Sequence, residues 1–128
     1  MPARILIIED NPASRDLVTY LLEKSGYSVR AAADGLQGLR LLGEFPADLI
    51  LCDLQMPALN GFEFIAKLRA SPDLRRLQVI AVTAFSMPGD RDKTLEAGFD
   101  GYFSKPIEPR SFVADVEAFL PAELRVAR

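Results

Sequence analysis

The segment "DLILCD", residues 48–53, decides the fold of this chain. Its central residues, Leu49 to Cys52, are apolar and predict a strand buried on both faces, as strands of a parallel sheet are. The strand ends in Asp53, a carboxylate pressed against the expected core. A buried charge is costly without a partner, so Asp53 needs compensating groups from neighbouring strands.

Four more strand-like runs alternate with helix-like segments along the chain. The expected strands are 4–9, 27–32, 48–53, 77–83 and 100–105, and the expected helices are 12–25, 35–44, 61–70, 88–97 and 109–120. This alternation predicts βαβ units and a parallel sheet. The first, third and fourth strands are nearly all apolar and so central, and the other two suit the edges. The sequence therefore predicts an α/β fold, (βα)5, with a doubly wound, flavodoxin-like sheet of order 2-1-3-4-5.

Each expected helix has an apolar face. The faces are Leu17, Val18, Leu21 and Leu22 in the first helix, Leu36, Leu39 and Leu42 in the second, Phe64, Ile65 and Leu68 in the third, and Phe112, Val113, Val116, Phe119 and Leu120 in the last. The segment 88–97 is the weakest helix, with Leu95 and Ala97 as its main anchors.

The composition excludes several classes of protein. The 128 residues suit one domain, 1–128, with a core of about 4–120, and 49% of them are hydrophobic. A net charge of -3 argues against direct contact with nucleic acid. No apolar run is long enough for a membrane span or for the core of a signal peptide. The single Cys52 indicates a reduced, cytoplasmic compartment. The absence of His removes His-based metal sites, His general bases and a phosphohistidine on this chain.

Polar residues stand at the carboxyl ends of the strands, where parallel sheets place their functional groups. They are Glu9 and Asp10 after the first strand, Asp53 at the end of the third, Thr83 at the end of the fourth and Lys105 at the end of the fifth. Taken singly, Asp10 fits a helix cap, Thr83 an ordinary strand residue and Lys105 a surface charge. Together they predict one site. Three clustered carboxylates with few other ligands point to Mg²⁺.

The ordered set of motifs resembles the receiver domain of bacterial response regulators, which is CheY-like in fold. The matching pieces are "IIEDN" (7–11), "DLQMPALNG" (53–61), "VTA" (82–84) and "SKP" (104–106). The resemblance covers residues 4–120. Residues 79–107 are most similar to DivK-like single-domain regulators and to the receiver domains of hybrid histidine kinases.

The resemblance assigns the phosphoryl chemistry to Asp53. Its carboxylate is the phosphoacceptor for a phosphohistidine on a histidine kinase or a histidine phosphotransfer protein. Besides Asp53 itself, the implied Mg²⁺ ligands are Asp10, Glu9 mainly through water, and the backbone carbonyl of Gln55. The resemblance implies no enzymatic activity on other molecules, only catalysis of the chain's own phosphorylation and dephosphorylation.

The resemblance also implies a switch. Lys105 pairs with Asp53 at rest and, after transfer, with a phosphoryl oxygen, and Thr83 bonds another phosphoryl oxygen. Tyr102 then swings inward; the equal alternative for Tyr102 is an edge-strand residue packed on the core. The bond before Pro106 is expected to be cis.

Gln55 and Phe85 tune the lifetime of the phosphoryl group, and packing against the helix that follows is the equal alternative for Phe85. Met56, Pro57 and Gly61 form the turn after the third strand. The output face is the fourth helix, fifth strand and fifth helix, with Arg91, Lys93, Tyr102, Glu108 and Arg110 as candidate surface residues.

The implied protein is a stand-alone cytoplasmic regulator, a monomer or weak dimer, that signals to a downstream protein target. One alternative is an excised hybrid-kinase receiver that relays phosphate. A flavin-binding module needs a Gly-, Ser- or Thr-rich loop after the first strand, where "EDNPAS" (9–14) stands instead. A phosphatase acting through an aspartyl phosphate wants an acid at position 55, which is Gln. A pseudo-receiver would lack some of the site residues, yet all are present.

Overall fold

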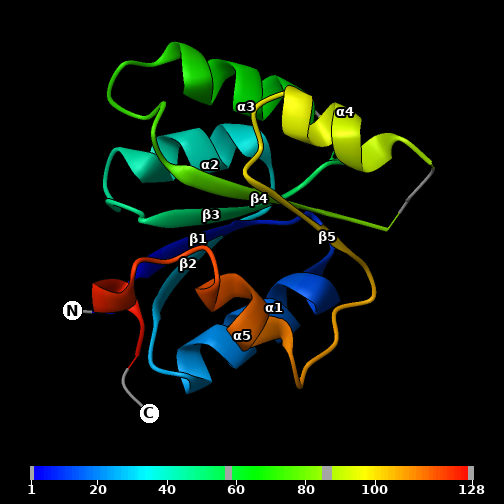
Figure 1. Ribbon diagram of the computed structural model, residues 1–128. Helices are drawn as coiled ribbons and strands as arrows, with labels where there is room; N and C mark the ends of the chain where they lie inside the picture. The colour runs from blue at the N-terminus through cyan, green and yellow to red at the C-terminus, as the bar shows by residue number, and fades with distance from the viewer. Residues whose placement is uncertain (1, 57–58, 85–87, 127–128) are drawn as a thin grey trace.

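The computed structural model describes residues 2–56, 59–84 and 88–126, and centres on a parallel sheet (Figure 1). Its strands are β1 (Arg4–Ile8), β2 (Ser28–Ala32), β3 (Leu49–Asp53), β4 (Gln78–Thr83) and β5 (Gly101–Ser104). The five strands lie in the order β2-β1-β3-β4-β5, and every neighbouring pair is parallel. The predicted fold class and strand order are confirmed.

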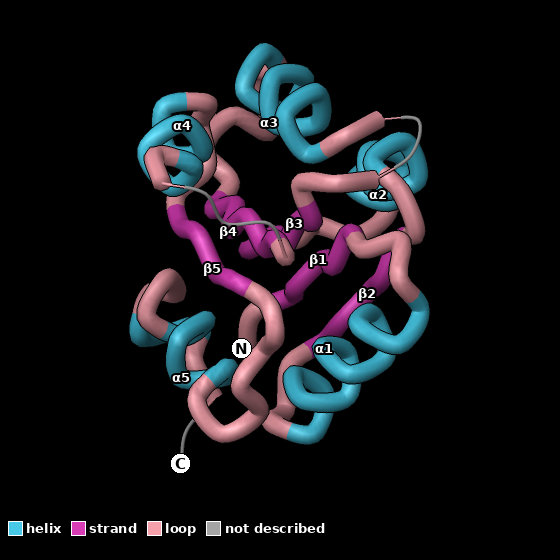
Figure 2. The backbone as a smooth tube through the Cα atoms, turned by 90° about the vertical axis from the view of Figure 1, so that its right-hand side faces the viewer, coloured by secondary structure: helices cyan, strands magenta, loops and turns pink. Residues whose placement is uncertain are grey.

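Helices cover both faces of the sheet. They are α1 (Pro12–Lys24), α2 (Gly35–Leu42), α3 (Gly61–Ala70), α4 (Asp90–Glu96) and α5 (Phe112–Glu117), and a short 3-10 helix, η1 (Ala122–Leu124), follows. Helices α1 and α5 lie on one face and α2, α3 and α4 on the other (Figure 2). In the part of the chain that the structure describes, no helix is long and apolar enough to cross a membrane.

The side chains of the central strands divide between two apolar clusters, because successive residues of a strand point to opposite faces. In β1, Leu6 and Ile8 belong to the cluster on the α2–α4 face, whereas Ile5 and Ile7 belong to the cluster on the α1–α5 face. All four are almost completely buried. Burying each such side chain stabilises the fold by about 1.5–3 kcal/mol. These two clusters hold the sheet between its helices.

Helix α1 begins at residue 12, as predicted, whereas α4 and α5 begin two and three residues later than expected. The residue that caps α1 is Asn11, not Asp10: the Asn11 side chain accepts a hydrogen bond from the Ser14 N–H. Asp10 is therefore left free of a capping role. Helix α5 begins at Phe112 rather than at residue 109, because the N–H groups of Ser111 and Phe112 both bond the carbonyl of Glu108 in a preceding turn.

The apolar faces of α1 and α2 are narrower than expected. Leu17 is 38% exposed and Leu36 is 48% exposed, although the sequence pattern places both on buried faces. Helix α2 lies so close to β1 that a Cβ on Gly38 would stand 2.5 Å from Ile8 Cδ1. Gly38 thus forms the contact surface of α2, and Leu36 points away from it.

The anchor of α4 is Thr94, not Ala97. Thr94 is buried and Ala97 is exposed. The Thr94 hydroxyl donates to the carbonyl oxygen of Asp90 at 2.7 Å, so its polar atom is satisfied inside the helix and its methyl group is free to pack. The helix begins after Gly89 with no side-chain cap. Helix α5 lacks a side-chain cap as well, so the expectation that α4 is the weakest helix stays a prediction.

The segment after α5 is tied to the beginning of the chain. The Ala3 N–H donates to the carbonyl of Leu124 at 2.8 Å, and η1 lies beside the start of β1 in Figure 1. The Tyr27 hydroxyl bonds the carboxylate of Glu117 and accepts from the Val126 N–H at 3.0 Å. These contacts lie at the end of the sheet where the strands begin.

We expect Gly61→Ala to destabilise the protein, because α3 starts against the backbone that ends β3. A Cβ at Gly61 would lie 2.7 Å from the Asp53 carbonyl oxygen and 2.8 Å from Leu54 Cα. Backbone atoms cannot rotate away, so the expected loss is about 1–3 kcal/mol in urea unfolding. Gly43→Ala is the control, since its nearest atom is the Arg40 carbonyl oxygen at 3.3 Å. Equal effects of the two substitutions would contradict the close-approach argument.

Candidate functional site

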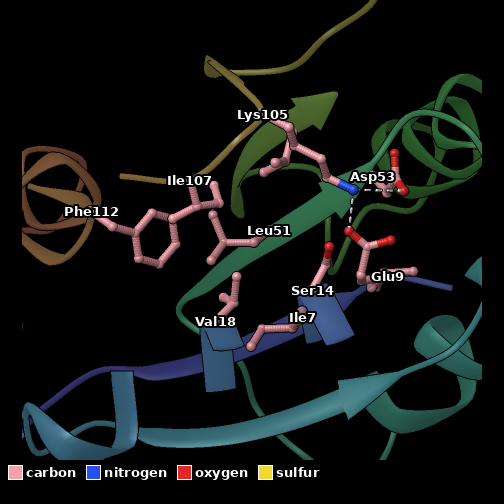
Figure 3. Close-up of a pocket in the computed structure, with 11 residues that line it drawn as sticks. Ile7, Glu9, Ser14, Val18, Leu51, Asp53, Lys105, Ile107 and Phe112 are labelled. Carbon is pink, nitrogen blue, oxygen red and sulfur yellow. Dashed lines mark hydrogen bonds and ion pairs between the residues drawn. The ribbon is translucent and has the colours of Figure 1, made fainter. Parts of the chain in front are cut away.

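The sequence-predicted site residues meet at the carboxyl edge of the sheet. Ile8 pairs with Cys52, Asp53 with Val82, and Thr83 with Ser104, so β3 extends one residue beyond β1, and β4 one residue beyond β3, along the same edge. The predicted side chains all stand at this edge: Glu9 and Asp10 after β1, Asp53 in β3, Thr83 in β4 and Lys105 after β5. Figure 3 shows the Lys105 side chain reaching between Glu9 and Asp53.

Lys105 is shared between two carboxylates. Its Nζ lies 2.5 Å from Glu9 Oε1 and 3.4 Å from Asp53 Oδ2. The expected Lys105–Asp53 pair is therefore present, and a shorter one to Glu9 stands beside it. The Lys105 N–H donates to the Thr83 carbonyl at 2.8 Å, and the Lys105–Pro106 bond is cis, as predicted.

Three carboxylates come together around this ammonium. One oxygen from each of Glu9, Asp10 and Asp53 lies within 4.8 Å of the others. Glu9 and Asp53 are each only 6% exposed, whereas Asp10 faces solvent. The donors are all oxygens, at the mouth of a hollow of about 420 Å³ that Gln55 also lines. Such a set fits a hard cation like Mg²⁺ and leaves room for water ligands.

Thr83 and Tyr102 lie on the opposite face of the sheet from the charged cluster. Asp53 continues the face of Leu49 and Leu51, which pack toward α1 and α5. Thr83 instead follows Val79 and Ala81, whose side chains point toward α2–α4, and it is 1% exposed. Tyr102 packs on the same α2–α4 cluster and Phe103 on the other, so the predicted alternation in β5 is confirmed.

Comparison with known proteins decides the family. The model of the response regulator receiver domain matches residues 5–117. The chain belongs to this family. The polar-differentiation response regulator DivK of Brucella anthropi is 39% identical over 120 residues, which span 94% of this chain and 98% of that protein.

Solved receivers share the fold along nearly the whole chain. The chemotaxis protein CheY4 of Vibrio cholerae superposes with a TM-score of 0.87 at 27% identity, covering 94% of this chain and all of the other. The receiver domain of the sensor histidine kinase PA1611 of Pseudomonas aeruginosa PAO1 gives 0.83 at 33% identity, covering 93% and 98%. That structure has a magnesium ion coordinated in its active site cleft. The family match disfavours the flavin-binding alternative.

Burial and the charges of this receiver site together shift the pKa values of Glu9 and Lys105. Burial is the main cause that raises the pKa of Glu9 above its usual value of 4.5, and the nearby Asp53 carboxylate adds to it while Lys105 opposes it. For Lys105, burial alone would lower the pKa, but the bond to Glu9 and the charge of Asp53 outweigh burial and raise it. One ammonium therefore does not fully offset the buried carboxylates.

Sequence reasoning missed two features of the receiver site. One is Arg15, whose Nη1 donates to the Glu9 carbonyl oxygen at 2.8 Å. The sequence did offer a signal for Arg15, namely its position one turn into α1. Side chains of a helix lean toward its N-terminal end, so Arg15 can reach the residues just before α1. The other is a small cavity of about 20 Å³ beside Lys105, whose apolar walls appear in Figure 3. They are Ile7, Ile8, Val18, Leu51, Val82, Ile107 and Phe112.

Some expectations concern the rim of the site and the output face. Phe85 and Pro57 lie outside the described residues. Met56 is buried in the turn after β3, and Gly61 begins α3. The other candidate output residues, Arg91, Lys93, Glu108 and Arg110, are exposed, whereas Tyr102 is half-buried.

We expect Asp53→Asn to stabilise the metal-free receiver by about 1 kcal/mol, because it removes one of two buried like charges. Asp53 and Glu9 share the ammonium of Lys105, so removing the charge of Asp53 leaves that ammonium to Glu9 alone. Urea unfolding without Mg²⁺ measures the change. Asp48→Asn is the matched control, since Asp48 stands just before the same strand and accepts from the Arg4 N–H at 2.8 Å. A less stable Asp53→Asn protein would contradict the repulsion argument.

We expect the stability of the metal-free receiver to fall as the pH rises through the raised pKa of Glu9. The folded state holds the Glu9 proton more readily than the unfolded chain, so this contribution is present below 4.5 and lost above the folded pKa. The Gln side chain in Glu9→Gln cannot titrate. The melting temperature of this variant minus that of wild type should therefore increase as the pH rises. Melting curves across that range test this, and a difference that shrinks with pH would refute it.

Proposed function

We propose that this receiver accepts a phosphoryl group on Asp53 from a phosphohistidine of a histidine kinase or phosphotransfer protein. One observation carries the proposal: the buried Asp53 carboxylate lies beside an ammonium and within 4.8 Å of two further carboxylates. A structural carboxylate would be expected to have more positive partners than negative ones. The excess of negative charge favours a site that binds a cation, which in turn draws in a phosphoryl group.

The chemistry is a displacement at phosphorus. An Asp53 carboxylate oxygen bonds to phosphorus as the bond from phosphorus to the imidazole nitrogen breaks, and that nitrogen keeps the electron pair and takes up a proton. Asp10, Asp53 and the Gln55 carbonyl would hold Mg²⁺, with Glu9 mainly through water, and the bound ion would neutralise negative charge on the carboxylates and the phosphoryl oxygens. Lys105 then pairs with one phosphoryl oxygen, so the chain contributes positioning and electrostatics.

Two observations support the metal. The PA1611 receiver, at 33% identity, holds a magnesium ion in its active site cleft. The donor set of this chain supports it independently, because Glu9, Asp10 and Asp53 offer only oxygen ligands. Mg²⁺ binding in the sub-millimolar to millimolar range corresponds to about 4–5 kcal/mol.

The proposed switch runs across the sheet. Thr83 bonds a phosphoryl oxygen, its movement opens room on the α2–α4 face, and Tyr102 moves inward on that same face. Helix α4 responds because few contacts hold it: it has seven residues, no side-chain cap at Gly89 and Thr94 as its buried residue. The output surface is α4, β5 and α5.

We further propose that the protein works as a stand-alone cytoplasmic regulator, monomeric or weakly dimeric, with a downstream protein target. The similarity to DivK over 98% of that protein supports this role. The second candidate is a relay receiver of a hybrid kinase. It is supported by the 33% identity to the receiver domain of a Pseudomonas sensor kinase.

With Mg²⁺ and acetyl phosphate, we expect wild type to gain one phosphoryl group, about 80 Da by intact mass, and Asp53→Asn to gain none. Lys105→Ala should react about a hundredfold more slowly, because a charge that stabilises the transferring group is lost. Asp48→Asn is the control for carboxylate loss nearby and should react normally. A folded, Mg²⁺-loaded wild type without the adduct would sink the proposal.

The same assay separates transfer from switching. Thr83→Ala should still gain the adduct, while the NMR shifts of Tyr102 and of the α4–β5–α5 face change much less than in wild type. A normal response of that face in Thr83→Ala would remove Thr83 from the switch and leave the phosphoacceptor intact. Phosphorylated wild type with an unmoved Tyr102 would favour the relay receiver.

A further inference from the structure

Of the three carboxylates in the site, Asp10 is held differently from the other two. The Glu9 carboxylate bonds Lys105 and accepts from the Asn11 N–H at 3.1 Å. The Asp53 carboxylate accepts from the Gln55 N–H at 3.1 Å and contacts Lys105. Across residues 2–56, 59–84 and 88–126, no hydrogen bond or ion pair fixes the Asp10 carboxylate. Its position therefore depends on the backbone that carries it.

That backbone is braced from α1 by a guanidinium. Arg15 Nη1 donates to the Glu9 carbonyl oxygen at 2.8 Å and lies 3.5 Å from the Asp10 carbonyl oxygen. The first of these oxygens belongs to the peptide that joins Glu9 to Asp10. The bond fixes the plane of that peptide, and hence the direction in which the Asp10 side chain leaves it.

We infer that Arg15 is a positioning residue for the metal site, an inference that rests on the proposed function. It touches neither the metal ligands' carboxylates nor the phosphoacceptor. It acts through the Glu9–Asp10 peptide and keeps the exposed Asp10 carboxylate within reach of a cation held by Glu9 and Asp53. The planar guanidinium presents its Nη1 to both carbonyl oxygens from a fixed direction, whereas the ammonium of a lysine is a compact point charge on a flexible stem.

Because Arg15 is positively charged, the direction in which its removal changes the affinity for Mg²⁺ tests the inference. If Arg15 acted only as a positive charge near the cluster, its removal would tighten cation binding, because repulsion falls. If it positions Asp10, its removal weakens binding. Arg15→Lys separates the two further, since it keeps the charge and loses the geometry of the guanidinium.

The first experiment is calorimetric titration of Mg²⁺ into wild type, Arg15→Ala and Arg15→Lys. We expect Arg15→Ala to bind Mg²⁺ about tenfold more weakly than wild type, which is the usual effect of removing a residue that holds a metal ligand in place. Arg15→Lys should also bind Mg²⁺ more weakly than wild type. The control is Lys24→Ala. It removes a positive charge from the last turn of the same helix, where Lys24 lies 5.5 Å from the Tyr20 ring centre. An Arg15→Ala protein that binds Mg²⁺ as tightly as wild type, or more tightly, overturns the inference.

Phosphorylation by acetyl phosphate gives a readout that a general loss of stability would not mimic. In Arg15→Lys the Mg²⁺ concentration needed for half-maximal rate should rise, while the rate at saturating Mg²⁺ stays close to that of wild type. A lowered maximal rate with an unchanged Mg²⁺ requirement would contradict a positioning role at the metal.

A measurement without metal keeps the inference separate from the proposed function. We expect amide hydrogen exchange at Asn11, whose N–H bonds the Glu9 carboxylate, to be faster in both Arg15 variants, with exchange in β3 unchanged. If wild type binds no Mg²⁺, the proposed function fails, but the exchange rate at Asn11 still shows whether Arg15 holds the Glu9–Asp10 peptide in place. Unaltered exchange at Asn11 would overturn the inference.

Discussion

Repulsion between carboxylates at a partly buried edge of the sheet is the constraint that shapes this structure. The parallel order of β1, β3 and β4 brings Glu9, Asp10 and Asp53 together, and a single ammonium, that of Lys105, stands among them. Backbone N–H groups supply part of the remaining compensation. The charge left over among the described residues is what the proposed cation would neutralise. Binding and chemistry thus draw on the same electrostatic imbalance that the fold must tolerate.

The arrangement of strands and of site residues could be predicted because both follow from simple patterns. Apolar runs fixed which strands are central, and the last residue of each strand fixed what meets at the edge. Helix faces were harder. A stripe of leucines covers a wider arc than the sheet contacts, so Leu17 and Leu36 remain exposed. Gly38 decides how close α2 lies, and Thr94 packs only because its hydroxyl bonds a carbonyl within α4.

Contacts from side chains to backbone carbonyls were beyond sequence reasoning, since every residue offers the same carbonyl. Arg15 reaches the carbonyl before Asp10, and Arg69 donates to the carbonyls of Gly98, Arg75 and Leu77 as well as to the Asp100 carboxylate. Both bind loops to a helix. The division of Lys105 between Glu9 and Asp53 was hidden for a related reason: a charge pair is set by side-chain reach, which spacing along the chain does not give.

The hydrogen bond between Ala3 and Leu124 closes the fold almost into a ring. A chain whose first strand and last turn already touch can be joined there by a short linker and opened elsewhere with little loss of contacts. The loop at 71–77 precedes β4 and so lies far from the carboxyl edge; opening the chain there would put at risk the bonds from Arg69 to the carbonyls of Arg75 and Leu77 but no bond of the site. Circular permutation at that loop would leave every strand end at the same edge, because the site is built by neighbours in the sheet and not by the order in which the chain forms them.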